Sequence, residues 1–120
     1  MKTTITIATT FAAAHRLPEH EGKCSRLHGH TYGLEVTVEG TPQASGPAEG
    51  MVMDFADLRQ RVNSLIVELL DHQLLNEVFA FVPTVEAMAA WIFDRLREAG
   101  LPVARVRLAE GPNTFVEVTA

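Results

Sequence analysis

Three histidines in the first quarter of the chain have the residue type and spacing of a metal site. His28 and His30 are two positions apart, so in an extended strand both side chains point to the same face. His15 ends an upstream apolar stretch that also has the pattern of a strand. Three imidazoles without a fourth protein ligand leave one coordination position open for water or substrate, which is typical of a catalytic zinc. Polar surface histidines are the alternative interpretation of the same pattern.

The single cysteine lies beside this possible metal site. Cys24 precedes His28 by four residues, which places a potential base or nucleophile near the metal. A lone cysteine cannot form an internal disulfide and fits a reducing cytoplasm. His20 lies among turn residues, so we interpret it as a solvent-exposed loop residue.

Two further polar positions suggest chemistry. Asp71 and His72 are adjacent, and a carboxylate near an imidazole can orient it for general acid–base catalysis; the alternative is that both merely cap the end of a helix. Glu110 has the same parity as Val106 and Leu108, so it projects from the apolar side of its strand. A carboxylate there needs a partner, either a ligand with adjacent N–H groups or a neighbouring arginine.

Alternating apolar residues predict the strands that position these groups. Residues 3–14 and about 30–40 alternate, and the three histidines share the parity of the apolar positions, so they face the core of an antiparallel pair unless a bulge intervenes. Residues 103–110 and 114–119 alternate around a Gly-Pro-Asn turn and predict a second hairpin. The Pro- and Gly-rich residues 41–50 predict a loop.

Two amphipathic helices lie between the hairpins. Asp54 is the expected N-cap of the first, whose apolar stripe is Phe55, Leu58, Val62, Leu65, Ile66 and Leu69. Thr84 is the expected N-cap of the second, with Glu86 in its first turn and Gly100 after its end. The order ββααββ predicts an α+β domain spanning residues 1–120, with a four-stranded antiparallel sheet and two helices on one face.

Composition narrows the possible partners and location. The 120 residues suffice for one core, and 47% of them are apolar, as in ordinary globular chains. No apolar run of about 18 residues is present, so we expect no membrane span. The first residues alternate instead of forming a signal-peptide core, which favours a cytoplasmic protein. A net charge of −5 disfavours a nucleic-acid partner.

The order of these residues along the chain is similar to that of a known protein family. The chain resembles the 6-pyruvoyl-tetrahydropterin synthase superfamily over essentially its whole length, through His15 in Ala-Ala-His-Arg-Leu, Lys23-Cys24-x-x-x-His28-Gly-His30-x-Tyr32, Gly50-Met-Val-Met-Asp54-Phe55, Asp71-His72-x-x-Leu-Asn76, Pro83-Thr84-x-Glu86 and Glu110. The three-residue gap between Cys24 and His28 resembles the bacterial 6-carboxy-tetrahydropterin synthase branch of the queuosine pathway. A branch that releases 6-hydroxymethyl-dihydropterin usually has glutamate where this chain has Cys24.

The resemblance implies a tunnelling fold, a trimeric barrel of joined sheets, and a hexamer made of two such trimers. Active sites would lie between subunits. Joining the sheets would also protect edge strands that are otherwise open to aggregation. The resemblance further implies a zinc ion held by His15, His28 and His30.

The remaining site roles also follow from the resemblance. Cys24 would be the thiolate base, with Asp71 and His72 as the second proton-transfer unit. Glu110 would hold the guanidine-like edge of a pterin, and Thr84 and Glu86 would line the same region.

The implied reaction converts 7,8-dihydroneopterin triphosphate to 6-carboxy-tetrahydropterin, acetaldehyde and triphosphate. Arg16, Lys23 and Arg26 are candidate triphosphate contacts or, equally, solvated surface charges. Relatives commonly have threonine after the pterin-binding glutamate, whereas this chain has Gly111 and Pro112. Three alternatives stay open: a 6-pyruvoyl product, a zinc hydrolase, and a non-catalytic zinc- or pterin-binding relative.

Overall fold

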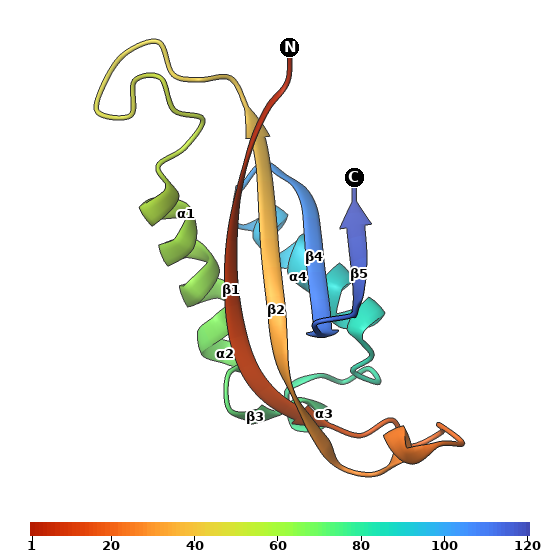
Figure 1. Cartoon of the computed structure of the whole chain (residues 1–120). Helices are drawn as coiled ribbons and strands as arrows, with labels where there is room; N and C mark the ends of the chain where they lie inside the picture. The colour runs from red at the N-terminus through yellow and green to blue at the C-terminus, as the bar shows by residue number, and fades with distance from the viewer.

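Two long antiparallel strands form the centre of the molecule. In the computed structural model, which describes residues 1–120, β1 (Thr3–His15) and β2 (His28–Gly40) pair along their whole length. Figure 1 shows this hairpin running from one end of the molecule to the other. Both strands were expected; β2 begins two residues earlier than predicted because His28 pairs with His15. The pairing therefore extends to His15 at the end of β1 and to His28 at the start of β2.

The sheet contains five strands. β4 (Val103–Gly111) pairs antiparallel with β2, and β5 (Thr114–Thr119) pairs antiparallel with β4. A two-residue strand, β3 (Gln73–Leu74), runs parallel to β1, so the order is β3-β1-β2-β4-β5. The predicted four antiparallel strands are all present, and β3 is the addition. Two residues are too few for a periodic pattern, so alternation could not predict this strand.

Two helical segments cover one face of the sheet (Figure 1). The first segment consists of α1 (Phe55–Val62), the π-helical turn η2 (Asn63–Val67) and α2 (Glu68–Leu70), and the second segment is α4 (Val85–Glu98). The chain also has two single helical turns, η1 (Lys23–Ser25) and α3 (Leu75–Val78). Asp54 and Thr84 are the N-caps, as predicted. Their side-chain oxygens accept the N–H groups of Ala56 at 2.7 Å and Ala87 at 3.1 Å.

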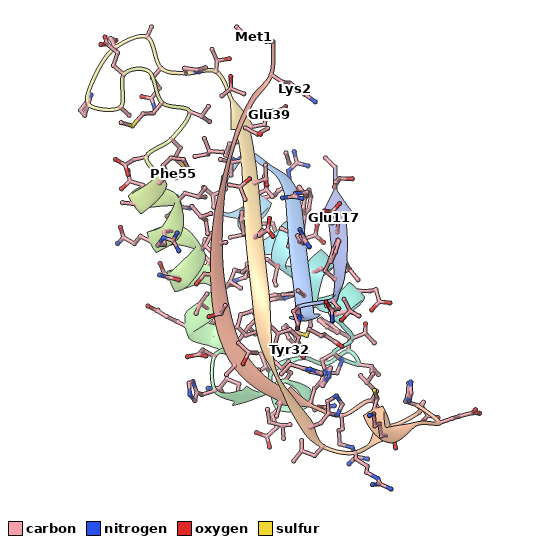
Figure 2. All side chains as sticks on the ribbon, in the orientation of Figure 1. Met1, Lys2, Tyr32, Glu39, Phe55 and Glu117 are labelled. Carbon is pink, nitrogen blue, oxygen red and sulfur yellow. The ribbon has the colours of Figure 1, made fainter.

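The buried stripe of the first segment differs from the predicted one at both ends. Phe55 and Leu69 are 59% and 41% exposed, and Leu70 is fully buried instead of Leu69. Figure 2 shows Phe55 at the start of α1, at the edge of the molecule. The shift arises from the π turn, which adds one residue to the helix and changes the phase of everything after it.

One hydrophobic core lies between the sheet and the helices. It contains 22 buried residues, contributed by alternate positions of the strands and by the inner faces of the helical segments. Tyr32 belongs to it, is fully buried, and stacks on Phe11 with ring centroids 5.0 Å apart. None of the helices has the length and hydropathy that a membrane-spanning helix requires.

The opposite face of the sheet is polar and is crossed by a network of charged side chains. Arg105 donates to Glu35 at 3.1 Å and to Glu117 at 2.8 Å, and Arg107 lies 3.4 Å from the second oxygen of Glu35. These contacts join β2, β4 and β5. The outer edge of β5 has no partner strand, and β1 is covered on its outer side by β3 only at Ala13 and Ala14. Both edges of the sheet are therefore largely open.

Candidate metal centre

The β1–β2 register brings the three histidines together. His15 lies opposite His28, and His30 lies opposite Ala13, so all three imidazoles project from the core face at one end of the hairpin. Their ring centroids are 4.6, 4.9 and 5.1 Å apart, and one ligand nitrogen of each lies within 4.8 Å of the others. His15 is completely buried, and the other two are partly buried. This cluster could hold a metal ion.

Backbone carbonyls set the tautomers of two of these histidines. His15 Nδ1 lies 2.8 Å from the Pro83 oxygen, and His28 Nδ1 lies 2.7 Å from the Arg26 oxygen. A carbonyl can only accept, so each Nδ1 carries the proton and each Nε2 keeps its lone pair. Backbone carbonyls are common partners of the second nitrogen of metal-bound histidines. The arrangement therefore prepares two neutral imidazoles to act as ligands.

Two nitrogens in the cluster have no partner of their own. Nε2 of His15 and Nε2 of His30 are buried and make no hydrogen bond. Leaving a buried polar atom unsatisfied is unfavourable, and native structures usually provide a reason for it. A cation bound among the three rings would satisfy both atoms, and three imidazole nitrogens form a donor set that suits zinc. The residues present thus fit such an ion.

Burial keeps His15 neutral. Loss of solvation lowers its pKa from 6.5; the Pro83 hydrogen bond opposes this change, while the nearby His28 and His30 add to it. Tyr32 lies on the core side of the histidine cluster, with its hydroxyl 3.4 Å from His15 Nδ1. Burial, assisted by the charge of Glu110, raises the pKa of the Tyr32 phenol, so it stays protonated. A neutral imidazole is the form that binds a metal.

Glu110 lies at the edge of the histidine cluster. Its Oε2 is 3.8 Å from His30 Nε2, and its side chain is 29% exposed. The β4–β5 pairing shifts register between Ala109 and Gly111, so Glu110 sits at an irregularity in the strand. The expectation that Glu110 faces the apolar side agrees with this position. No arginine pairs with it, so the carboxylate is available to a ligand.

Asp71 and His72 are held against β1 at the start of β3. Asp71 accepts the Ala12 N–H through Oδ1 and the His72 Nδ1–H through Oδ2, both at 2.9 Å. The Ala12 and His72 hydrogen bonds lower the pKa of the Asp71 carboxyl. His72 has φ of 60°, an uncommon conformation for a non-glycine residue, and its backbone N–H donates to the Ala12 carbonyl. The His72 side chain is 81% exposed, so its Nε2 is open to solvent or a ligand.

The remaining predicted residues lie at different distances from this centre. A surface depression along β1, β2 and β3 contains both His30 and His72. Cys24 is in η1 and half-buried, and it is not among the residues that converge on the metal position. Thr84 caps α4 next to Pro83, and the side chain of Glu86 is exposed, with no hydrogen bond or ion pair. The basic residues Arg16, Lys23 and Arg26 are all exposed.

One supporting residue had no predicted role. The Asn76 side chain accepts the Arg16 N–H and donates to the Arg16 carbonyl, both at 2.9 Å. It thereby fixes the backbone immediately after His15. The only sequence signal was its place in the Asp71 to Asn76 motif. Pro83 and Arg26 contribute through backbone carbonyls, which any residue type could supply.

Comparison with known proteins gives consistent results. The family described as 6-pyruvoyl tetrahydropterin synthase matches residues 4–120. A 6-carboxy-5,6,7,8-tetrahydropterin synthase from Synechocystis sp. is 48% identical over 95 residues, covering 78% of this chain and 74% of that protein. A dihydroneopterin monophosphate aldolase from Pyrococcus furiosus is 38% identical over 121 residues, 98% of each. The structure of a Caenorhabditis elegans 6-pyruvoyl tetrahydropterin synthase superimposes with a TM-score of 0.86 at 29% identity, covering 100% of this chain and 96% of that one.

Proposed function

The chain belongs to the 6-pyruvoyl tetrahydropterin synthase family, and from this membership we propose that it is a zinc-dependent lyase acting on a dihydropterin triphosphate. The proposed reaction converts 7,8-dihydroneopterin triphosphate and one water to 6-carboxy-5,6,7,8-tetrahydropterin, acetaldehyde and triphosphate. It would serve the synthesis of 7-deazaguanines such as queuosine. The observation that carries the proposal is the cluster of three histidines whose free nitrogens converge next to Glu110.

His15, His28 and His30 would hold the zinc ion. When bound, zinc acts as a Lewis acid that acidifies substrate hydroxyls and stabilises negative charge on oxygen. The protein supports this role by presenting neutral imidazoles with two fixed tautomers. The fully buried Tyr32 lies on the core side of the site, with its hydroxyl 3.4 Å from His15 Nδ1.

Glu110 would bind the pterin ring. The amino and N–H groups of a pterin form two adjacent donors, which a carboxylate can accept together, and such charge-assisted pairs are strong. The position of Glu110 next to His30 would place the side chain of the bound pterin toward the histidines. Thr84 would contribute through its backbone next to Pro83, and Glu86 would line the same region from the first turn of α4.

Cys24 and the Asp71–His72 pair would move protons. As a thiolate, Cys24 would remove a proton from the substrate side chain. His72 would exchange a proton through its exposed Nε2, while Asp71 fixes the ring through Nδ1 and stabilises the protonated imidazole. Two groups are needed because isomerisation of the side chain requires a proton to leave one carbon and another to be added elsewhere.

Assembly would complete these sites. The open outer edges of β1 and β5 can each accept a strand from another copy of the chain. We propose a barrel of three subunits and a hexamer made of two barrels, with active sites between subunits. In that arrangement, residues of one subunit would complete the site of another.

Product identification tests the proposal. Zinc-loaded protein is incubated with 7,8-dihydroneopterin triphosphate, and the pterin product and acetaldehyde are measured by mass spectrometry. A 6-pyruvoyl product without acetaldehyde would instead indicate triphosphate elimination alone. Because the chain is similar to the Pyrococcus furiosus aldolase, dihydroneopterin monophosphate is tested separately as an alternative substrate. Its cleavage would release glycolaldehyde phosphate and 6-hydroxymethyl-dihydropterin. Binding without turnover of either substrate would identify a non-catalytic relative.

A further inference from the structure

The helical segment that leads to Asp71 contains the π turn η2, which inserts one residue relative to a regular α-helix. Its fully buried residues, Leu58, Val62, Ile66 and Leu70, follow one another in steps of four. With 3.6 residues per turn, three such steps would rotate the buried stripe by about 120°. The π turn absorbs this rotation, because the Glu68 N–H donates to the Asn63 carbonyl five residues earlier. The turn therefore keeps Leu70 in the core and decides the direction in which Asp71 leaves the helix.

Arg95 reaches this turn from α4. Its Nε–H donates to the Leu65 carbonyl at 2.6 Å, and its guanidinium lies 5.5 Å from the centroid of the Trp91 ring. No other side chain of α4 donates a hydrogen bond to the first helical segment. Arg95 is only partly exposed, so the bond is protected from competing water. The contact thus joins the packed α4 to the one irregular turn of the neighbouring segment.

The position of Asp71 depends on where the helix delivers it. The Asp71 N–H still belongs to the helix, since it donates to the Val67 carbonyl at 2.8 Å, while its carboxylate accepts from Ala12 of β1. His72, in its unusual backbone conformation, follows immediately. A helix one residue out of phase would rotate Asp71 by about 100° and separate it from Ala12. The proton-transfer pair is therefore linked to the geometry of the π turn.

We propose that Arg95 is a positioning residue: by holding the Leu65 carbonyl it fixes the π turn, and with it the place of the Asp71–His72 pair against β1. The catalytic consequence rests on the proposed function. The position of Asp71 does not, because it can be measured without substrate.

Two substitutions separate the hydrogen bond from the bulk of the side chain. Arg95→Gln places an N–H donor the same number of bonds from Cα as the arginine Nε, whereas Arg95→Met places a methyl group there. Arg95→Leu also lacks a donor and has a shorter apolar side chain, so it serves as a second donor-free variant if Arg95→Met does not fold. Arg97→Met is the matched control, because Arg97 lies in the same helix and stacks on Phe93 without binding a carbonyl.

The first measurement is an NMR titration of the Asp71 carboxyl in each variant without substrate. In the unaltered protein its pKa lies below the ordinary value because of Ala12 and His72. We expect this pKa to rise toward the ordinary value in Arg95→Met and Arg95→Leu, and to stay in place in Arg95→Gln and Arg97→Met. An unchanged titration in the donor-free variants would overturn the proposal, and so would an Arg95→Gln variant as disturbed as Arg95→Met.

The second measurement is turnover with the zinc content confirmed. Displacing a catalytic group by about 1 Å can reduce the rate by as much as a hundredfold, so we expect kcat of the donor-free variants to fall by about tenfold or more. KM for the pterin substrate should change little, because the Arg95 side chain donates its hydrogen bond to Leu65 and to no residue of the proposed zinc or pterin site. If the Asp71 titration shifts while kcat stays unchanged, Arg95 is still the positioning residue and the catalytic role of Asp71 and His72 is wrong.

Discussion

His15 donates its Nδ1–H to the carbonyl of Pro83 at 2.8 Å, across 68 positions of sequence. Pro83 directly precedes Thr84, the residue that caps α4. The end of β1 is therefore joined to the start of α4 through one histidine of the candidate metal cluster. The orientation of that ring depends on the packing of the whole domain and not on the hairpin alone.

Removing the thiol of Cys24 should slow the removal of a proton from the substrate side chain and leave metal binding unchanged. A general base typically contributes between about 10² and 10⁴ in rate, so we expect Cys24→Ala to lower kcat by that range. Its zinc content should match that of the unaltered protein, because Cys24 is outside the histidine cluster. Steady-state kinetics and metal analysis on the same sample test both statements. A fully active Cys24→Ala variant would refute the assigned base.

Replacing Glu110 by glutamine should weaken substrate binding. The change keeps the shape of the side chain but removes the charge and replaces one acceptor with a donor. Hydrogen bonds to charged groups contribute about 1.5–3 kcal/mol, so Kd for a pterin should rise roughly tenfold to a hundredfold. Calorimetric titration with a non-reactive pterin measures this. Glu117→Gln, on the opposite face of the sheet, is the control and should bind the pterin normally.

Asn76 should support zinc binding without contacting the ion. Asn76→Ala removes two hydrogen bonds to the backbone of Arg16, next to His15. Loss of residues that orient metal ligands typically costs about 10–100-fold in affinity, and we expect an effect in this range from competition with a chelator. Asn113→Ala, in the exposed turn before β5, provides the comparison. Equal zinc affinities in the two variants would show that Asn76 does not orient His15.

The metal-free protein should lose stability as the pH falls below about 6.5. Burial lowers the pKa of His15, so between its folded and unfolded pKa values the unfolded chain binds the extra proton. The corresponding stability is present above 6.5 and is lost as the pH falls through the folded pKa, with a slope of at most about 1.4 kcal/mol per pH unit. Urea unfolding at several pH values measures the slope. His15→Gln should flatten it, whereas His20→Gln, in the exposed loop, should not.

The strands and the histidine cluster were predictable because both depend on alternation. Ile5, Ile7 and Phe11 define the buried face of β1, and a histidine with the same parity must share that face. Capping by Asp54 and Thr84 was equally local, since a cap needs only its own side chain and the next turn. These features are properties of short stretches of sequence.

The π turn and β3 were not predictable, because each depends on distant partners. Leu69 and Leu70 are both suitable core residues, and only the contacts of η2 with its neighbours decide between them. β3 forms because the Asp71–His72 region binds Ala12, far away in sequence. The supporting groups of Arg26 and Pro83 are backbone carbonyls, so side-chain identity carries no information about them.

Nε2 of His15 and Nε2 of His30 are buried without a hydrogen bond, which costs the metal-free chain stability that an ion bound there would restore. Any ion that binds only the native chain stabilises it by mass action, in proportion to the logarithm of its free concentration. With zinc as the proposed ion, cells short of zinc would hold more of this polypeptide in states open to proteolysis. Its abundance, and not only its turnover number, would then follow zinc supply.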